Sequence, residues 1–259
     1  MKTSFRTFLF VALSALAPSL LKAETLEGPL WPNTGGYTIM TPSGWGASNG
    51  MVFFGVGRTM PQVYANQDDM GAGTGIGIGD PQKNLGVELS VDMNDVSARD
   101  NFSYGFKVHR VIYDGTAIAV GGEHLFYDKN KSDAGNSFYV SVSHAIQGLP
   151  SNYDSEQSKL NLSLGVGNGR YSHKSDDDVA AGKGKHGTYV FGAASYEIFE
   201  ATNFIVEWSG INLNAGISTG LFSLSDNIPV NLTLAAGDLT KYSGDGVKFL
   251  SALSLAVIF

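Results

Sequence analysis

One pattern repeats along the chain between residues 51 and 259: about ten residues of alternating apolar and polar character, then turn-forming residues. In one such segment the apolar positions are Val87, Leu89, Val91 and Met93, and the polar positions between them are Glu88, Ser90 and Asp92. A period of two is the signature of a β-strand with two unlike faces. No apolar stretch after residue 23 approaches the ~20 residues that a membrane-spanning helix requires. The pattern therefore predicts an all-β chain.

Counting these segments predicts about twelve strands, and the pattern allows ten to fourteen. The expected strands are 51–59, 71–79, 85–94, 101–110, 116–127, 137–146, 159–168, 188–199, 202–211, 214–223, 229–237 and 248–259. Most have the length of a tilted strand that crosses a bilayer, which is about 9–11 residues.

The connections alternate in length, as they do in antiparallel up-and-down membrane barrels, whose turns are short on one side and whose loops are long on the other. The short turns are Asp80–Asn84, Tyr113–Gly115, Glu200–Ala201 and Ser225–Ile228, and the long loops are Met60–Met70, Asp128–Asn136, Gly169–Gly187 and Asp238–Val247. Three connections depart from this rule: Gln147–Ser158 is long for a turn, and Asp95–Asp100 and Gly210–Leu213 are short for loops. The predicted fold is an antiparallel up-and-down transmembrane β-barrel over residues 51–259.

Residues 1–23 have the composition of a secretory signal peptide, with cleavage expected after Ala23. Lys2 and Arg6 precede an apolar run, Phe8–Ala17, that is too short to span a bilayer. Residues 24–50 are rich in Gly, Pro and Ser and precede the first strand. This stretch is interpreted as either a periplasmic tail or an N-terminal plug folded into the barrel.

The exported chain is acidic and has no cysteine. Cleavage after Ala23 would remove three bases and no acid, which leaves 14 Lys and Arg against 24 Asp and Glu and a formal charge of −10. Such a charge argues against nucleic acid as a partner.

The last twelve residues, 248–259, end in Phe259, and apolar side chains step back from it by two to Leu253, with Phe249 further up the same column. These positions are Phe249, Leu253, Leu255, Val257 and Phe259. The strand resembles the C-terminal strand of bacterial outer-membrane β-barrel proteins. That resemblance covers about residues 51–259 and implies an outer-membrane location, recognition of the last strand by the barrel-assembly machinery, and contact with outer-membrane lipid and lipopolysaccharide. It implies no particular activity and no oligomeric state.

Ionisable side chains lie on the non-aliphatic faces of the predicted strands, where they would line the barrel. They are Glu88, Asp92, Lys107, His109, Glu123 and Glu207. Charged groups at membrane depth are costly unless they face water or one another. Acids outnumber bases four to one in this set when His is neutral, which favours a hydrated passage for small polar or cationic solutes. The alternative is a closed structural or adhesive barrel that acts through its external loops.

An enzymatic role is the third hypothesis, and the sequence supports it least. His124 lies near one strand end, and Ser103 or Ser137 on a neighbouring strand would be its partner in a lipid hydrolase, but no orienting acid or Asn shares its column. We therefore predict no catalytic residue, no metal and no cofactor. The acids at 176–178 and Lys174, Lys183 and Lys185 are interpreted as a solvated loop tip, with lipopolysaccharide contact as a weaker alternative.

Glycines occupy alternate positions from Gly71 to Gly79, so they share one face of a predicted strand. A phosphate-binding loop would space its glycines differently and continue into a helix. We interpret this face as one that lets the sheet curve or leaves room in the barrel for an inward segment.

Overall fold

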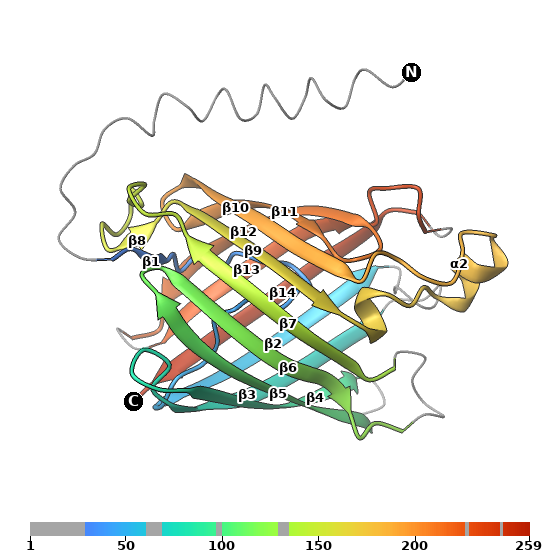
Figure 1. The fold of residues 1–259 in the computed structure, drawn as a ribbon, viewed down its shortest axis with the longest axis horizontal. Helices are drawn as coiled ribbons and strands as arrows, with labels where there is room; N and C mark the ends of the chain where they lie inside the picture. The colour runs from blue at the N-terminus through green and yellow to red at the C-terminus, as the bar shows by residue number, and fades with distance from the viewer. Residues whose placement is uncertain (1–28, 61–68, 97–99, 129–134, 226–227, 244–245) are drawn as a thin grey trace, which may run out of the picture.

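The computed structural model describes residues 29–60, 69–96, 100–128, 135–225, 228–243 and 246–259. Within these residues, twelve antiparallel strands form one closed barrel (Figure 1). They are β2 (Met51–Met60), β3 (Asp69–Gly79), β4 (Gly86–Asp95), β5 (Asp100–Tyr113), β6 (Thr116–Leu125), β7 (Ser137–Ala145), β9 (Leu160–Gly167), β10 (Val190–Phe199), β11 (Thr202–Trp208), β12 (Leu213–Ser223), β13 (Pro229–Gly237) and β14 (Lys248–Ile258). The pairing of β14 with β2, with Leu253 opposite Val56, closes the barrel.

The predicted fold class is confirmed: each of the twelve predicted segments overlaps one strand of the barrel. The largest differences are at β5, which continues to Tyr113, and at β11, which ends at Trp208. The two-residue strand β8 (Gln157–Ser158) lies in the long turn between β7 and β9 and pairs in parallel with β1 (Trp31–Pro32). The predicted signal peptide, residues 1–23, lies outside the described residues.

The barrel has two unlike ends. At one, here called the turn end, the connections include 80–85, 114–115 and 200–201, and the chain terminates there, where the amide of Phe259 donates to the carbonyl of Gly50 at 2.8 Å. At the other, the loop end, the connections include 168–189, which contains α2 (Asp176–Ala180), and 238–247 (Figure 1). The predicted loops Met60–Met70 and Asp128–Asn136 fall largely outside the described residues.

The outer face of the barrel is apolar and the inner face is polar. In β7, for example, Phe138 and Val140 are exposed on the outside, whereas Ser141 and Ser143 are buried on the inside. A water-soluble barrel has the opposite arrangement, and a membrane barrel has this one because its outer face meets lipid. In the described part of the chain, no helix has the length and apolar character needed to cross a membrane.

Candidate functional site in the barrel interior

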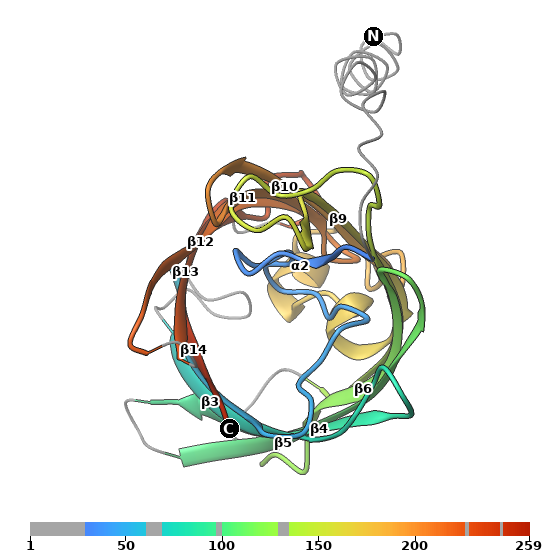
Figure 2. The ribbon, with the colours of Figure 1, turned by 90° about the vertical axis from the view of Figure 1, so that its left-hand side faces the viewer.

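Residues 29–50, here called the inner segment, run through the interior of the barrel at its turn end. Figure 2, viewed from that end, shows the segment crossing toward β12 and returning past β6 to β4 and β5. It enters beside Gln147, whose side-chain amide both accepts from and donates to the backbone of Leu30 at 2.8 and 2.9 Å. Further along, the side-chain amide of Asn33 donates to that of Asn203 on β11 at 3.0 Å. The stretch is therefore bound to the inner wall of the barrel.

Glu207, on β11, holds the middle of the inner segment. Its carboxylate accepts hydrogen bonds from the consecutive backbone amides of Ile39, Met40 and Thr41 at 2.8 to 3.1 Å. The hydroxyl of Thr41 and the side-chain amide of Asn214 add two more, at 2.9 and 3.0 Å. Glu207 is fully buried. A buried carboxylate is costly unless donors satisfy it, and here the donors come mostly from the inner segment.

A second group of side chains, on β4 and β5, holds the end of the inner segment. The ammonium of Lys107 donates to the carbonyl of Trp45 at 3.1 Å, and Nε2 of His109 lies 2.9 Å from the carbonyl of Ala47. The carboxylate of Glu88 accepts from the amide of Ala47 at 2.9 Å and lies 3.8 Å from the ammonium of Lys107. Lys107 thus binds a carbonyl group, and Glu88 binds an amide group, of the same backbone stretch.

The glycine face of β3 makes this course possible. A Cβ atom at Gly77 would collide with the backbone of Ala47 and Ser48, so only glycine lets the inner segment approach β3 this closely. Asn49 then donates its amide to the carbonyl of Gly79 at 2.8 Å. The sequence allowed two interpretations of the glycines at Gly71–Gly79. At Gly77 the structure shows one of them, in which glycine leaves room for an inward segment.

At the loop end the connection 168–189 also enters the barrel. Tyr171, in the short 3-10 helix η2 (Gly169–Tyr171), packs against Tyr139 and Phe191, which point inward from β7 and β10. Burial raises the pKa of the Tyr171 phenol well above its usual value, so the group stays protonated and donates to the carboxylate of Glu123 at 2.7 Å. Arg170 lies 3.5 Å from the same carboxylate. Glu123 therefore anchors this loop as Glu207 anchors the inner segment.

The inner wall is covered unevenly. From β6 to β11 nearly all inward side chains are buried beneath the inner segment or the loop 168–189. On β14, by contrast, the inward residues Ala252 and Ser254 are exposed, and beside them a Cβ at Gly55, Gly57 or Gly71 would meet no atom closer than 3.5 Å. These five residues of β14, β2 and β3 are called the uncovered strip. Their small side chains leave open space on one side of the interior.

All six residues predicted to line a pore lie on the inner face, but they differ in what they contact. Glu88, Lys107, His109 and Glu207 bind the inner segment, and Glu123 binds Arg170 and Tyr171. Asp92 differs: its carboxylate is 3.4 Å from the hydroxyl of Ser90 and projects over Gly73, next to the uncovered strip. Four further residues that bind the inner segment or anchor the loop 168–189 could not be predicted, because their partners are far away in the chain. They are Gln147, Asn203, Arg170 and Tyr171.

The serines considered for a hydrolase point inward, away from lipid. Ser103 is buried and shares hydrogen bonds with Asn94, and Ser137 is buried and accepts from the amide of Arg170 at 3.0 Å. The ring of His124 stacks on Tyr127 with 4.4 Å between centroids. A hydrolase acting on membrane lipid needs its serine on the outer face, and neither serine is there.

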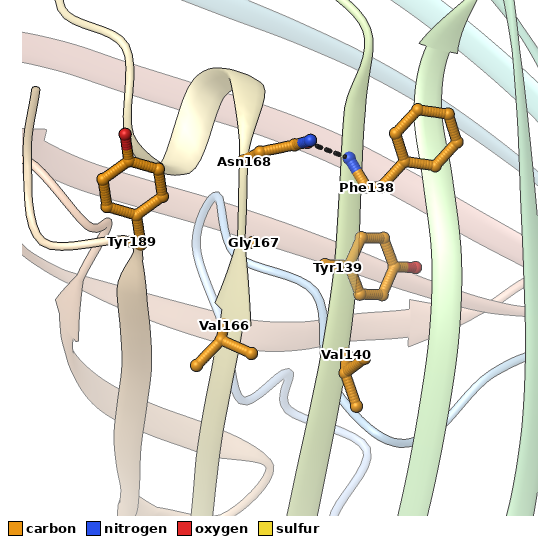
Figure 3. A pocket seen from close by; sticks show the side chains of 7 residues that line it. All are labelled: Phe138, Tyr139, Val140, Val166, Gly167, Asn168 and Tyr189. Atoms are coloured by element: carbon orange, nitrogen blue, oxygen red, sulfur yellow. Dashed lines mark hydrogen bonds between the residues drawn. The ribbon is translucent and has the colours of Figure 1, made fainter.

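Two apolar grooves lie on the outer face among the described residues. The smaller, about 390 Å³, lies at the loop ends of β7 and β9, with the rings of Phe138 and Tyr189 on its sides and Val140 and Val166 below them (Figure 3). Beside this groove, the side-chain oxygen of Asn168 accepts a hydrogen bond from the backbone amide of Phe138 at 2.8 Å. The larger, about 690 Å³, spans β2 to β6 and includes Tyr104 and Phe126. Aromatic side chains at this depth are typical of the membrane–water interface.

The loop predicted to be a solvated tip is more ordered than the sequence suggested. Asp178 is buried in α2, and the hydroxyl of Ser243 donates to it at 3.4 Å. The ammonium of Lys174 donates to the carbonyls of Lys183 and Tyr242 at 2.8 and 3.1 Å. The connections 168–189 and 238–247 therefore bind each other across the loop end.

No family model and no curated protein sequence matches the chain. Among solved structures, a KdgM porin in complex with disordered oligogalacturonate is similar at 8% identity and a TM-score of 0.48, over 81% of this chain and 99% of that one. Outer membrane phospholipase A from Escherichia coli is similar at 9% identity and a TM-score of 0.43, over 82% of this chain and 97% of that one. These similarities are too remote to assign an activity. With an apolar outer face, a polar interior and twelve antiparallel strands in a closed ring, the described residues form a transmembrane β-barrel.

Proposed function

We propose that the protein is a passive channel for small polar or cationic solutes, with its turn end toward the periplasm. The observation that carries this proposal is the uncovered strip, where small inward residues remain exposed while nearly all inward side chains from β6 to β11 are buried. Glycine, alanine and serine there leave space for water and present no fixed charge. A solute would pass between this strip and the inner segment.

The charge preference of such a path would depend on Asp92. The carboxylates of Glu207 and Glu88 accept hydrogen bonds from backbone amides, and that of Glu123 is paired with Arg170. Within the part of the chain that the structure describes, the carboxylate of Asp92 has only the Ser90 hydroxyl as a hydrogen-bond partner. It also interacts electrostatically with Glu123 and Glu88, which add negative potential, and with Arg170, which opposes it. A carboxylate beside a narrow aqueous path attracts cations and repels anions.

We expect discrete conductance steps when the purified protein is reconstituted in planar bilayers, with a reversal potential in a KCl gradient that favours K⁺. Asp92→Asn should lower the cation-to-anion permeability ratio roughly two-fold, because it removes a fixed charge within a Debye length of the path. Glu200→Gln removes an equal charge from an exposed turn and should leave the ratio unchanged. A folded barrel without conductance steps would contradict the channel and favour a closed structural or adhesive barrel.

We also propose that the assembly machinery recognises the last strand through Phe259. Its ring is 86% exposed, whereas its backbone is bound to Gly50, so the side chain is available to a partner. Phe259→Ala should reduce the folded, inserted fraction in cells several-fold, whereas refolding in detergent should be unaffected because the backbone bond remains. Phe204→Ala, which removes an exposed aromatic ring from the outer face of β11, is the control. Equal losses in cells and in detergent would show a folding defect instead.

A further inference from the structure

Two histidines face each other on a small hairpin at the loop end. The amide of Gly187 donates to the carbonyl of Ser172 at 2.7 Å, and the amide of Lys174 donates to the carbonyl of Lys185 at 3.2 Å. His173 and His186 lie opposite each other between these two bonds, as an antiparallel bridge. They therefore form a non-hydrogen-bonded pair, the class in which facing side chains are closest. Both are exposed.

The separation of the two rings matches that of two imidazoles bound to one metal ion. A metal–nitrogen bond of about 2.0–2.1 Å places each ring centroid roughly 3.2 Å from the metal, and a tetrahedral angle then sets the centroids roughly 5 Å apart. The observed centroid distance is 5.1 Å, with 73° between the ring planes. The backbone of the hairpin thus already holds the rings at this spacing.

The hydrogen bonds of both rings involve Nδ1 and not Nε2. Nδ1 of His173 lies 3.3 Å from the carbonyl of Gly169 and 3.2 Å from the hydroxyl of Ser172. The carbonyl can only accept, so it favours the tautomer with the proton on Nδ1 and the lone pair on Nε2. Nδ1 of His186 lies 3.3 Å from the hydroxyl of Tyr189. Metal-binding histidines commonly use the second nitrogen in this way, with a carbonyl or hydroxyl fixing the ring.

We propose that Nε2 of His173 and Nε2 of His186 together bind a divalent transition-metal ion. Imidazole suits Cu²⁺, Ni²⁺ and Zn²⁺, and among these Cu²⁺ binds most tightly to a given set of nitrogen ligands. The described residues contain no group of three His, Cys, Asp or Glu side chains that would form a closed site, so water completes the coordination. The bound ion cross-links the two sides of the hairpin just outside Tyr171, which anchors the loop in the barrel.

Titration of the full chain in detergent with CuCl₂ and with NiCl₂, followed by calorimetry, tests the proposal. The protein must be purified without a polyhistidine tag. We expect one site per chain with a dissociation constant on the order of 10 µM. Two imidazoles that chelate one ion can supply the corresponding binding free energy. The Cu²⁺ electron paramagnetic resonance spectrum should show coupling to nitrogen.

The variants separate a chelate from adventitious binding. His173→Ala and His186→Ala should each weaken binding at least about ten-fold, because the chelate is lost with either ligand, and the double variant should bind no more tightly than either single variant. His144→Gln, on β7 at the turn end, is the control and should bind as the wild type does. Undiminished binding in His186→Ala, or no binding by the folded wild type, would overturn the proposal. Conductance plays no part in this test, so its outcome is independent of the channel.

Discussion

Deleting residues 30–47 is expected to raise the single-channel conductance of the proposed channel several-fold, because the inner segment crosses the barrel interior at the turn end. The barrel itself should still form, since its strand ladder is closed without the segment and the side chains left behind face water. The measurement is the step size in planar bilayers, with circular dichroism to verify the strand content of the deletion variant.

A synthetic peptide of residues 30–47 provides the matched control for the deletion. Added on the side of the turn end, it should reduce the conductance of the deletion variant and leave the wild type unchanged, because only the variant has Glu207 available to backbone amides. A deletion variant that conducts as the wild type does would show that the inner segment does not limit the path.

The barrel could be predicted from sequence because its determinants are local. Period-two alternation fixes which residues form strands and which of them share a face, and short turns fix the connectivity. Both pieces of information lie within about ten residues of chain. This is why β13 has the predicted bounds, 229–237, and why Glu207 lies on the polar face of β11.

The roles of the inward charges could not be predicted in the same way. Glu207 is bound by Met40, which lies 167 residues earlier in a stretch with no periodicity. A carboxylate satisfied by backbone amides has the same sequence signature as one that lines a water-filled pore. The alternating glycines of β3 and the composition of residues 24–50 were the local signs that something enters the barrel. His173 and His186 likewise become neighbours only through the shape of their loop.

Glu207→Leu is expected to release the inner segment from β11. The substitution leaves the amides of Ile39, Met40 and Thr41 without their acceptor, and each unsatisfied buried donor costs about 1–3 kcal/mol. Because the segment can move into water, it should detach locally while the barrel stays folded. We expect conductance between those of the wild type and the deletion variant, with rapid fluctuations, and new sites of limited proteolysis within residues 36–44.

Glu197→Gln is the matched control for this release. Glu197 is also a buried glutamate on the inner face of the neighbouring strand β10, but it accepts from the amide of Asn152 in the turn 146–159 and not from the inner segment. Glu207→Gln keeps one acceptor oxygen and should fall between Glu207→Leu and the wild type. If Glu197→Gln and Glu207→Leu changed the conductance equally, the effect would come from lost charge in the barrel, and Glu207 would not hold the segment in place.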